Sequence, residues 1–88
     1  MKQSEKKIEK KLRDTVKAKG GLSLKLLPFQ FTGLPDRLVI LPGGSAQFVE
    51  TKSTGDTLSP RQKIVHAKLN ALGFTVRIIN KIEDIEKL

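Results

Sequence analysis

The stretch that decides the fold runs from Gly33 to Lys52 and reads GLPDRLVILPGGSAQFVETK. It holds two apolar runs, Leu38–Leu41 and Ala46–Val49, separated by the turn residues Pro42–Ser45. Two such runs joined by a short Pro/Gly-rich connector are typical of a β-hairpin. We therefore expect an antiparallel strand pair at the centre of the chain.

The register of this hairpin decides which side chains meet at its open end. If the turn pairs Leu41 with Ser45, two carboxylates converge there, because Asp36 then lies opposite Glu50. A turn that is one residue different moves the partner of Asp36 to a neighbour of Glu50. The sequence leaves this choice open.

Two facing carboxylates destabilise a hairpin unless a proton or a cation lies between them. A hard divalent cation such as Mg²⁺ or Mn²⁺ resolves the conflict, because it takes oxygen ligands from one or two carboxylates, water and phosphate. Strand side chains alternate, so Lys52 points the same way as Glu50. Lys52 could then orient or help to deprotonate an attacking water, or stabilise the charge on an attacked phosphate. The competing interpretation is chance, since an acidic residue followed by Glu-x-Lys is a common pattern.

Composition bounds the class of protein. Eighty-eight residues predict one small domain, residues 1–88, which is marginally stable alone and would benefit from a partner subunit. The chain has no cysteine, which excludes a disulfide framework and a thiolate metal site. Its longest apolar run is too short to cross a bilayer and its N-terminus is charged, so we expect a cytoplasmic protein without a membrane partner.

The net charge of +8 is concentrated in the first part of the chain. Residues 1–25 hold nine Lys/Arg and three Asp/Glu, a balance of +6, whereas residues 26–88 hold eight and six, a balance of +2. This excess favours a polyanion partner such as nucleic acid, although a solvated lysine-rich helix would give the same composition. With four Phe and no Tyr or Trp, a base-stacking platform is not expected.

Helices are expected on both sides of the hairpin. Residues 4–19 carry an apolar stripe behind a Ser4 cap, and Gly20 and Gly21 end the helix. Alternating leucines at 22, 24 and 26 predict a strand with one buried face. Ser59 and Gln62 form a capping box around a proline at the first helical position, and this helix should run to about Leu72.

The remaining elements follow from the same patterns. The second helix should bury Val65, Leu69 and Leu72. Residues 74–79 predict an interior strand, and Asn80 with Glu83 predicts a capped final helix whose apolar face packs on the domain or on a second copy. The order α-β-β-β-α-β-α gives an α/β fold in which a small mixed sheet is flanked by helices.

Three short motifs in this order, GLPDR at 33–37, FVETK at 48–52 and LSPRQ at 58–62, closely resemble the virus-type replication-repair nuclease (VRR-NUC) domain. That family is a branch of the PD-(D/E)xK nuclease superfamily, and the likeness covers essentially the whole chain. The resemblance implies a restriction-endonuclease-like core and a Mg²⁺- or Mn²⁺-dependent nuclease. Stand-alone, phage-type members look like dimeric resolvases of four-way (Holliday) junctions, so it also implies a homodimer that binds branched DNA and works in DNA repair, in the host cytoplasm if phage-encoded.

The resemblance also implies roles for individual residues. Asp36 and Glu50 would hold the metal, with the main-chain oxygen of Thr51 nearby, and Lys52 would assist the attack of water. A glutamate of the first helix matches Glu9, with Glu5 as the competitor, and Glu9 could instead form surface pairs with lysines. The matching glutamine is Gln62, which could cap its helix, reach into the site, or do both.

Two further interpretations stay open at this stage. His66 is expected more often at a surface or an interface than in a catalytic role, because carboxylates suffice for a hard metal. The chain could also be a non-catalytic basic DNA-binding module, a flap nuclease or an RNA-processing nuclease of the same fold. A cleavage assay with Asp36→Ala and Lys52→Ala separates the enzyme from the binding module.

Overall fold

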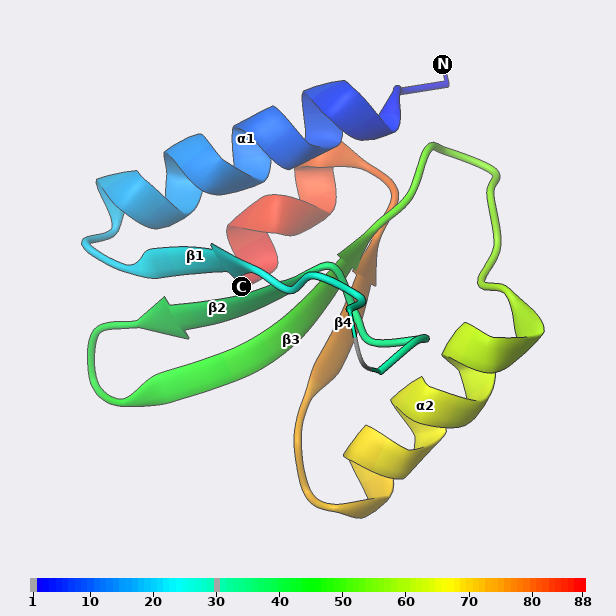
Figure 1. The fold of residues 1–88 in the computed structure, drawn as a ribbon. Helices are drawn as coiled ribbons and strands as arrows, with labels where there is room; N and C mark the ends of the chain where they lie inside the picture. Colours follow the sequence, from blue (N-terminus) through cyan, green and yellow to red (C-terminus); the bar gives the residue numbers. More distant parts are fainter. Residues whose placement is uncertain (1, 30) are drawn as a thin grey trace.

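The computed structural model describes residues 2–29 and 31–88 and contains a four-stranded sheet with helices on both faces (Figure 1). In chain order the elements are α1 (Glu5–Ala18), β1 (Leu22–Lys25), β2 (Arg37–Leu41), β3 (Ser45–Thr51), α2 (Pro60–Ala71), β4 (Val76–Ile79) and the 3₁₀ helix η1 (Ile82–Lys87). No helix within the described ranges combines the length and the apolar composition that a membrane span requires. The predicted mixed α/β architecture is confirmed.

The sheet has the order β1-β2-β3-β4, with antiparallel pairing from β1 to β3 and parallel pairing between β3 and β4. In the central hairpin Leu41 pairs with Ser45. This is one of the registers that the turn allowed, and continuing it by one residue beyond the Arg37–Val49 pair places Asp36 opposite Glu50. The hairpin thus brings the two carboxylates to the same end of the sheet.

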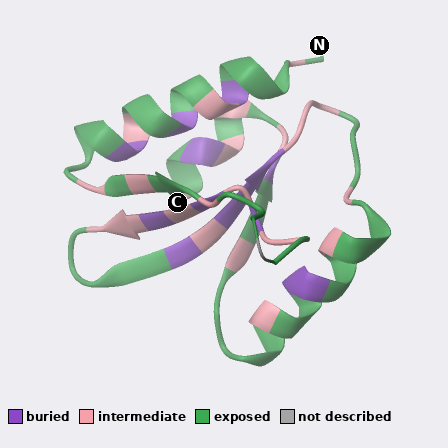
Figure 2. Cartoon of the chain, in the orientation of Figure 1, coloured by how far each residue is buried: buried purple, intermediate pink, exposed green. Residues whose placement is uncertain are grey.

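One face of the sheet is covered by α1 and η1, which lie together on the same side in Figure 1. Ser4 caps α1 as predicted, because its side chain accepts a hydrogen bond from the backbone N–H of Lys7 at 3.2 Å. Buried segments of α1, the strands and η1 face one another in Figure 2. The core consists of seven buried aliphatic residues: Ile8, Leu12, Val16, Val39, Val49, Ile79 and Ile85. Burying one such side chain contributes about 1.5–3 kcal/mol, so this cluster fixes α1 on the sheet.

The other face of the sheet is only partly covered, and here the prediction of a buried face on the first strand is wrong. Leu22 and Leu24 are 58% and 43% exposed. Their strand pairs with β2 so that Ser23, opposite Val39, points toward α1 and the leucines point away from it. The apolar alternation was read correctly as a strand, but it is the serine side that meets the helix.

The C-terminal elements also differ from the prediction. The last strand is an edge strand of the sheet rather than an interior one, and only Ile79 in it is buried. The final helix is a 3₁₀ helix whose N-cap is Lys81, without a side-chain cap, so the predicted Asn80 cap is wrong. Its apolar side chains pack on the domain core, which was one of the two alternatives for this face.

The α2 helix is held against the loop that precedes Asp36. Gly33 has a φ of +86°, and a Cβ atom there would lie 2.8 Å from Val65 Cγ2 and 2.9 Å from Arg61 Cγ. Only glycine allows this close approach, so Gly33 fixes the loop on α2. The predicted buried stripe of α2 is partly wrong: Val65 is buried, but Leu69 is only partly buried, and Leu72, the residue that caps the end of the helix, is 65% exposed.

Candidate active site

Asp36 stands just before β2 and is oriented by the end of β3. Its Oδ2 accepts hydrogen bonds from the backbone N–H of Thr51 at 3.1 Å and from the Thr51 hydroxyl at 2.9 Å. Thr51 is fully buried, so this double contact holds the carboxylate in one direction. The family resemblance assigned to Thr51 only a main-chain oxygen near the metal. Its hydrogen bonds to the Asp36 carboxylate were not predicted, since no spacing rule in the sequence signals them.

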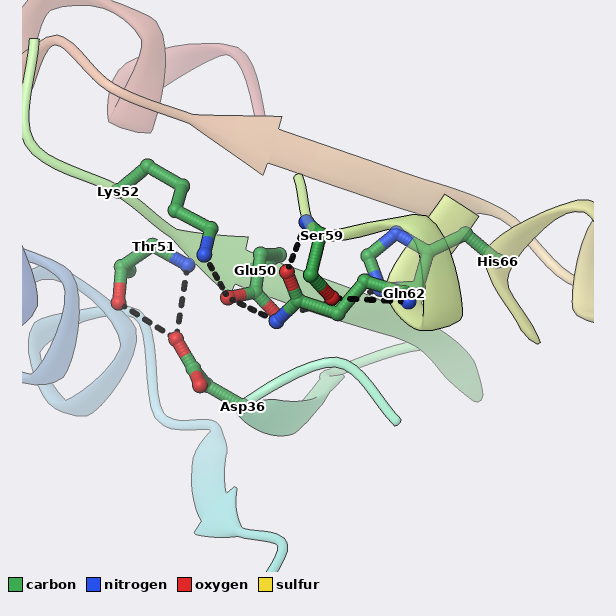
Figure 3. A network of polar contacts seen from close by, with 7 residues as sticks. All are labelled: Asp36, Glu50, Thr51, Lys52, Ser59, Gln62 and His66. Atoms are coloured by element: carbon green, nitrogen blue, oxygen red, sulfur yellow. Dashed lines mark hydrogen bonds and ion pairs between the residues drawn. The ribbon is translucent and has the colours of Figure 1, made fainter. Parts of the chain in front are cut away.

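Glu50 is the most enclosed acidic group of the site, with 1% of its surface exposed. Its Oε2 accepts a hydrogen bond from Gln62 Nε2 at 3.3 Å, and Lys52 Nζ lies 3.7 Å from the same oxygen. Figure 3 shows Lys52 and Gln62 approaching Glu50, with Asp36 and Thr51 beside them. The structure therefore brings Asp36, Glu50, Lys52 and Gln62 together, as the sequence predicted.

Asp36 and Glu50 are close enough for the charge of one carboxylate to affect the pKa of the other. Burial, with the neighbouring charge of Asp36 as the next cause, raises the pKa of Glu50 from 4.5 to about 7, while Lys52 acts in the opposite direction. A buried carboxyl whose pKa lies near neutrality is a frequent sign of a functional site, because a purely structural site gains nothing from it. A cation placed between the two carboxylates would favour the ionised form of Glu50.

The side chain of Gln62 both caps its helix and reaches into the site. Its backbone N–H donates to Ser59 Oγ at 3.2 Å, and its side-chain Oε1 accepts from the Ser59 backbone N–H at 2.9 Å, which completes the capping box. The same side chain donates through Nε2 to Glu50. An amide has both a donor and an acceptor end, so one side chain can fix the start of α2 and hold the carboxylate.

The two glutamates of α1 have different surroundings. Glu9 forms a salt bridge of 2.7 Å with the buried Arg37, and this hydrogen bond lowers the pKa of Glu9. Burial raises the pKa of Glu5, with the nearby charge of Asp36 as the next cause and Lys52 opposing it. The charges of Asp36 and Lys52 therefore act on the pKa of Glu5, whereas Glu9 is paired with Arg37.

The start of α1 is tied to the loop that follows Lys52, which explains why Glu5 lies near the site. Thr54 donates its backbone N–H to the Gln3 carbonyl at 3.0 Å, and Gln3 returns a hydrogen bond to Thr54 Oγ1 at 2.9 Å. The backbone N–H of Glu5 donates to Ser53 Oγ at 3.2 Å. These contacts hold the N-terminal end of the helix at the same edge of the sheet as the acidic pair.

His66 is not the surface residue that the sequence favoured. It is 4% exposed, and its Nε2 lies 3.9 Å from Glu50 Oε1. Burial lowers the pKa of His66, and the charge of Lys52 adds to this effect, while the charge of Asp36 opposes it. The signal in the sequence is the spacing of four residues from Gln62: it suggests a neighbouring face of the helix, but residues four apart lie on the same side of α2.

The residues present fit a hard divalent cation. Thr51 occupies Oδ2 of Asp36 and Gln62 occupies Oε2 of Glu50, which leaves one oxygen of each carboxylate outside these bonds. Glu50 Oε1 is buried without a hydrogen-bond partner in the described chain. Within residues 2–29 and 31–88 no three His, Cys, Asp or Glu side chains gather as a metal-binding group. A cation here would therefore take two carboxylates and complete its shell with main-chain, water or phosphate oxygens, as Mg²⁺ commonly does.

A separate cavity of about 460 Å³ lies between α2 and the segment around Phe31 and Leu34. Its lining is mostly apolar and includes none of the four residues gathered at the acidic pair. The acidic pair thus lies at the end of the hairpin and does not line this cavity.

Comparison with known proteins agrees with this geometry. The family model of the VRR-NUC domain matches residues 4–81. A protein of Acyrthosiphon pisum secondary endosymbiont phage 1, named "Putative nuclease p44", is 42% identical over 73 residues, which cover 83% of this chain and 78% of that protein. A solved structure described as a VRR_NUC domain superposes with a TM-score of 0.87 at 31% identity, covering 98% of this chain and 95% of the other.

Proposed function

The chain belongs to the VRR-NUC family of nuclease domains, and on this basis we propose that residues 1–88 form one Mg²⁺- or Mn²⁺-dependent endonuclease domain that hydrolyses DNA phosphodiesters. The observation that carries the metal dependence is the convergence of Asp36 and Glu50 at the end of the hairpin, with the pKa of Glu50 raised to about 7. Two such groups are compatible in their ionised forms only with a cation nearby.

Each residue of the site has a role in this proposal. Asp36 and Glu50 hold the cation, with the Thr51 main-chain oxygen within the same region, and Gln62 keeps the Glu50 carboxylate in place. When bound, the metal would polarise the phosphate and lower the pKa of a coordinated water. Lys52 orients that water or stabilises the charge that develops on the phosphate.

The covalent change is a simple hydrolysis. A bond forms between the water oxygen and phosphorus, the bond from phosphorus to one sugar oxygen breaks, and one proton of the water is transferred through solvent to the departing oxygen.

Glu5 and Glu9 lie on α1 beside this region. Glu5, whose backbone N–H donates to Ser53 next to Lys52, would contact water at the site, and Glu9 would support the site indirectly through its salt bridge with Arg37.

We further propose that the substrate is a branched duplex, in particular a four-way junction, cut by a homodimer. The partly open sheet face supports a second copy, because Leu22, Leu24 and Ile78 stay 58%, 43% and 47% exposed on it. A chain of this size would gain stability if a second copy covered this apolar patch. A two-fold dimer would also present two equivalent sites to a junction. The net charge of +8 suits a DNA backbone.

A side-by-side cleavage assay tests this proposal. Four-way junctions, flaps and linear duplexes are incubated with the protein and Mg²⁺ or Mn²⁺, and sedimentation velocity is recorded on the same preparation. We expect paired incisions related by symmetry in the junction, slower cutting of linear duplex, and a solution mass of twice the 9.8 kDa chain mass. Preferential flap cutting by a monomer would contradict the resolvase assignment, and preferential cutting of branched RNA would contradict the DNA assignment.

A further inference from the structure

The sequence contains a single histidine, and the structure buries it beside Glu50. Among the described residues, neither ring nitrogen of His66 has a hydrogen-bond partner, and neither does Glu50 Oε1, 3.9 Å from His66 Nε2. Buried polar atoms in native proteins nearly always have partners, so unpaired buried atoms that face each other call for an explanation. Figure 3 shows the imidazole on the same helix as Gln62, directed toward the region of Glu50.

We propose that His66 is a positioning residue of the nuclease site, whose imidazole carries a proton on Nε2 and donates it as a hydrogen bond to Glu50 Oε1. This inference rests on the proposed function and assigns to that site a residue outside the acidic pair, Lys52 and Gln62. The present separation exceeds a hydrogen bond by about 1 Å, which a small rotation of either side chain removes. Such contacts are often long before the metal and the substrate are bound.

The two carboxylate oxygens of Glu50 have different neighbours, and His66 would supply the hydrogen-bond donor for one of them. Oε2 is already approached by Gln62 Nε2 and Lys52 Nζ, whereas Oε1 has no hydrogen-bond partner among the described residues and lies 3.9 Å from His66 Nε2. A carboxylate oxygen has two lone pairs, so Oε1 can accept a proton donor and still serve a cation. Residues that hydrogen-bond a ligating carboxylate fix its orientation and commonly change metal affinity 10–100-fold.

The start of α2 positions both donors together. Gln62 and His66 are four residues apart, and the helix is fixed there by the Ser59 capping box and by the close contact of Gly33 with Val65. The helix therefore delivers two hydrogen-bond donors to one carboxylate, one to each oxygen. Direct metal ligation by His66 is disfavoured, because hard cations prefer oxygen ligands.

The test uses two variants of the full chain together with nitrogen NMR of the wild type. His66→Gln keeps a donor near the position of Nε2, and His66→Phe keeps a ring of similar size without any donor. Mn²⁺ binding is measured by calorimetry without DNA, and thermal unfolding confirms that each variant is folded. We expect His66→Phe to weaken Mn²⁺ binding about 10–100-fold and His66→Gln to stay within about 3-fold of the wild type.

Because the chain has a single imidazole, the NMR signals belong to His66 without ambiguity. The tautomer of His66 is measured in the wild type, so this test does not depend on the folding of a variant. We expect long-range ¹⁵N–¹H correlations of the wild type to show the neutral tautomer protonated on Nε2. A proton on Nδ1 alone, or equal Mn²⁺ affinity in the wild type and His66→Phe, would overturn the role of His66. A wild type that neither binds Mn²⁺ nor cuts DNA would instead overturn the proposed nuclease chemistry, so the two failures are distinguishable.

Discussion

Replacing Asp36 by asparagine, or Lys52 by alanine, should lower the rate of junction cleavage by at least about 10²–10³-fold while the protein stays folded. Asparagine keeps the shape of the side chain and an oxygen that can accept the Thr51 hydrogen bonds, but it removes the charge that would hold a cation. Alanine at 52 removes the ammonium group that lies 3.7 Å from Glu50 Oε2. Single-turnover cleavage of a labelled junction in Mg²⁺ measures both effects.

Lys63→Ala is the matched control for this experiment. Lys63 is an exposed cation of α2 outside the acidic pair, so its loss should reduce binding slightly at low salt and leave the single-turnover rate at saturation unchanged. Equal rates for the wild type and Asp36→Asn would contradict the enzyme assignment. The alternative of a non-catalytic, basic DNA-binding module would then be the better description.

Glu50→Gln should stabilise the metal-free protein at pH 8, even though it removes a group that the nuclease needs. The pKa of Glu50 is about 7 in the folded protein and about 4.5 in an unfolded chain, so the folded state holds its proton more tightly. This contribution to stability is fully present below pH 4.5 and is lost as the pH rises through 7. The loss amounts to about 3 kcal/mol of unfolding free energy.

Thermal unfolding in EDTA measures this effect. Glutamine is uncharged at every pH, so we expect the variant to melt about 12 °C or more above the wild type at pH 8, and the difference to shrink toward pH 5. Added Mg²⁺ should raise the melting temperature of the wild type at pH 8 and not that of the variant. A variant that melts below the wild type at pH 8 would show that the ionised carboxylate is favourable without a cation.

Several features of the fold could be predicted because they depend on contacts near in sequence. The turn at Pro42–Ser45 limited the hairpin to a few registers, and the capping box at Ser59 and Gln62 is a local motif. The stripe of α1 needed only helical periodicity. By contrast, the edge position of β4 and the open face at Leu22 depend on which elements finally cover the sheet, and strand alternation alone cannot say which face is covered.

The candidate site divides in the same way. Asp36, Glu50 and Lys52 meet because of one hairpin, so their proximity followed from the register. Glu5 and Glu9 are one helical turn apart on the same side of α1, about 6 Å along the axis, and periodicity cannot choose between them. The choice depends on the distant Gln3–Thr54 contacts at the start of the helix. The burial of His66 likewise depends on how α2 is rotated against β3, which involves residues far apart in the chain.

The most direct test of the metal site is anomalous diffraction from crystals of the full chain grown or soaked with Mn²⁺. We expect an anomalous peak between Asp36 and Glu50, within about 2.0–2.6 Å of an oxygen from each carboxylate. Crystals that show these two carboxylates directed to separate surfaces, with no anomalous density between them at saturating Mn²⁺, would contradict a metal-dependent nuclease centred on this hairpin.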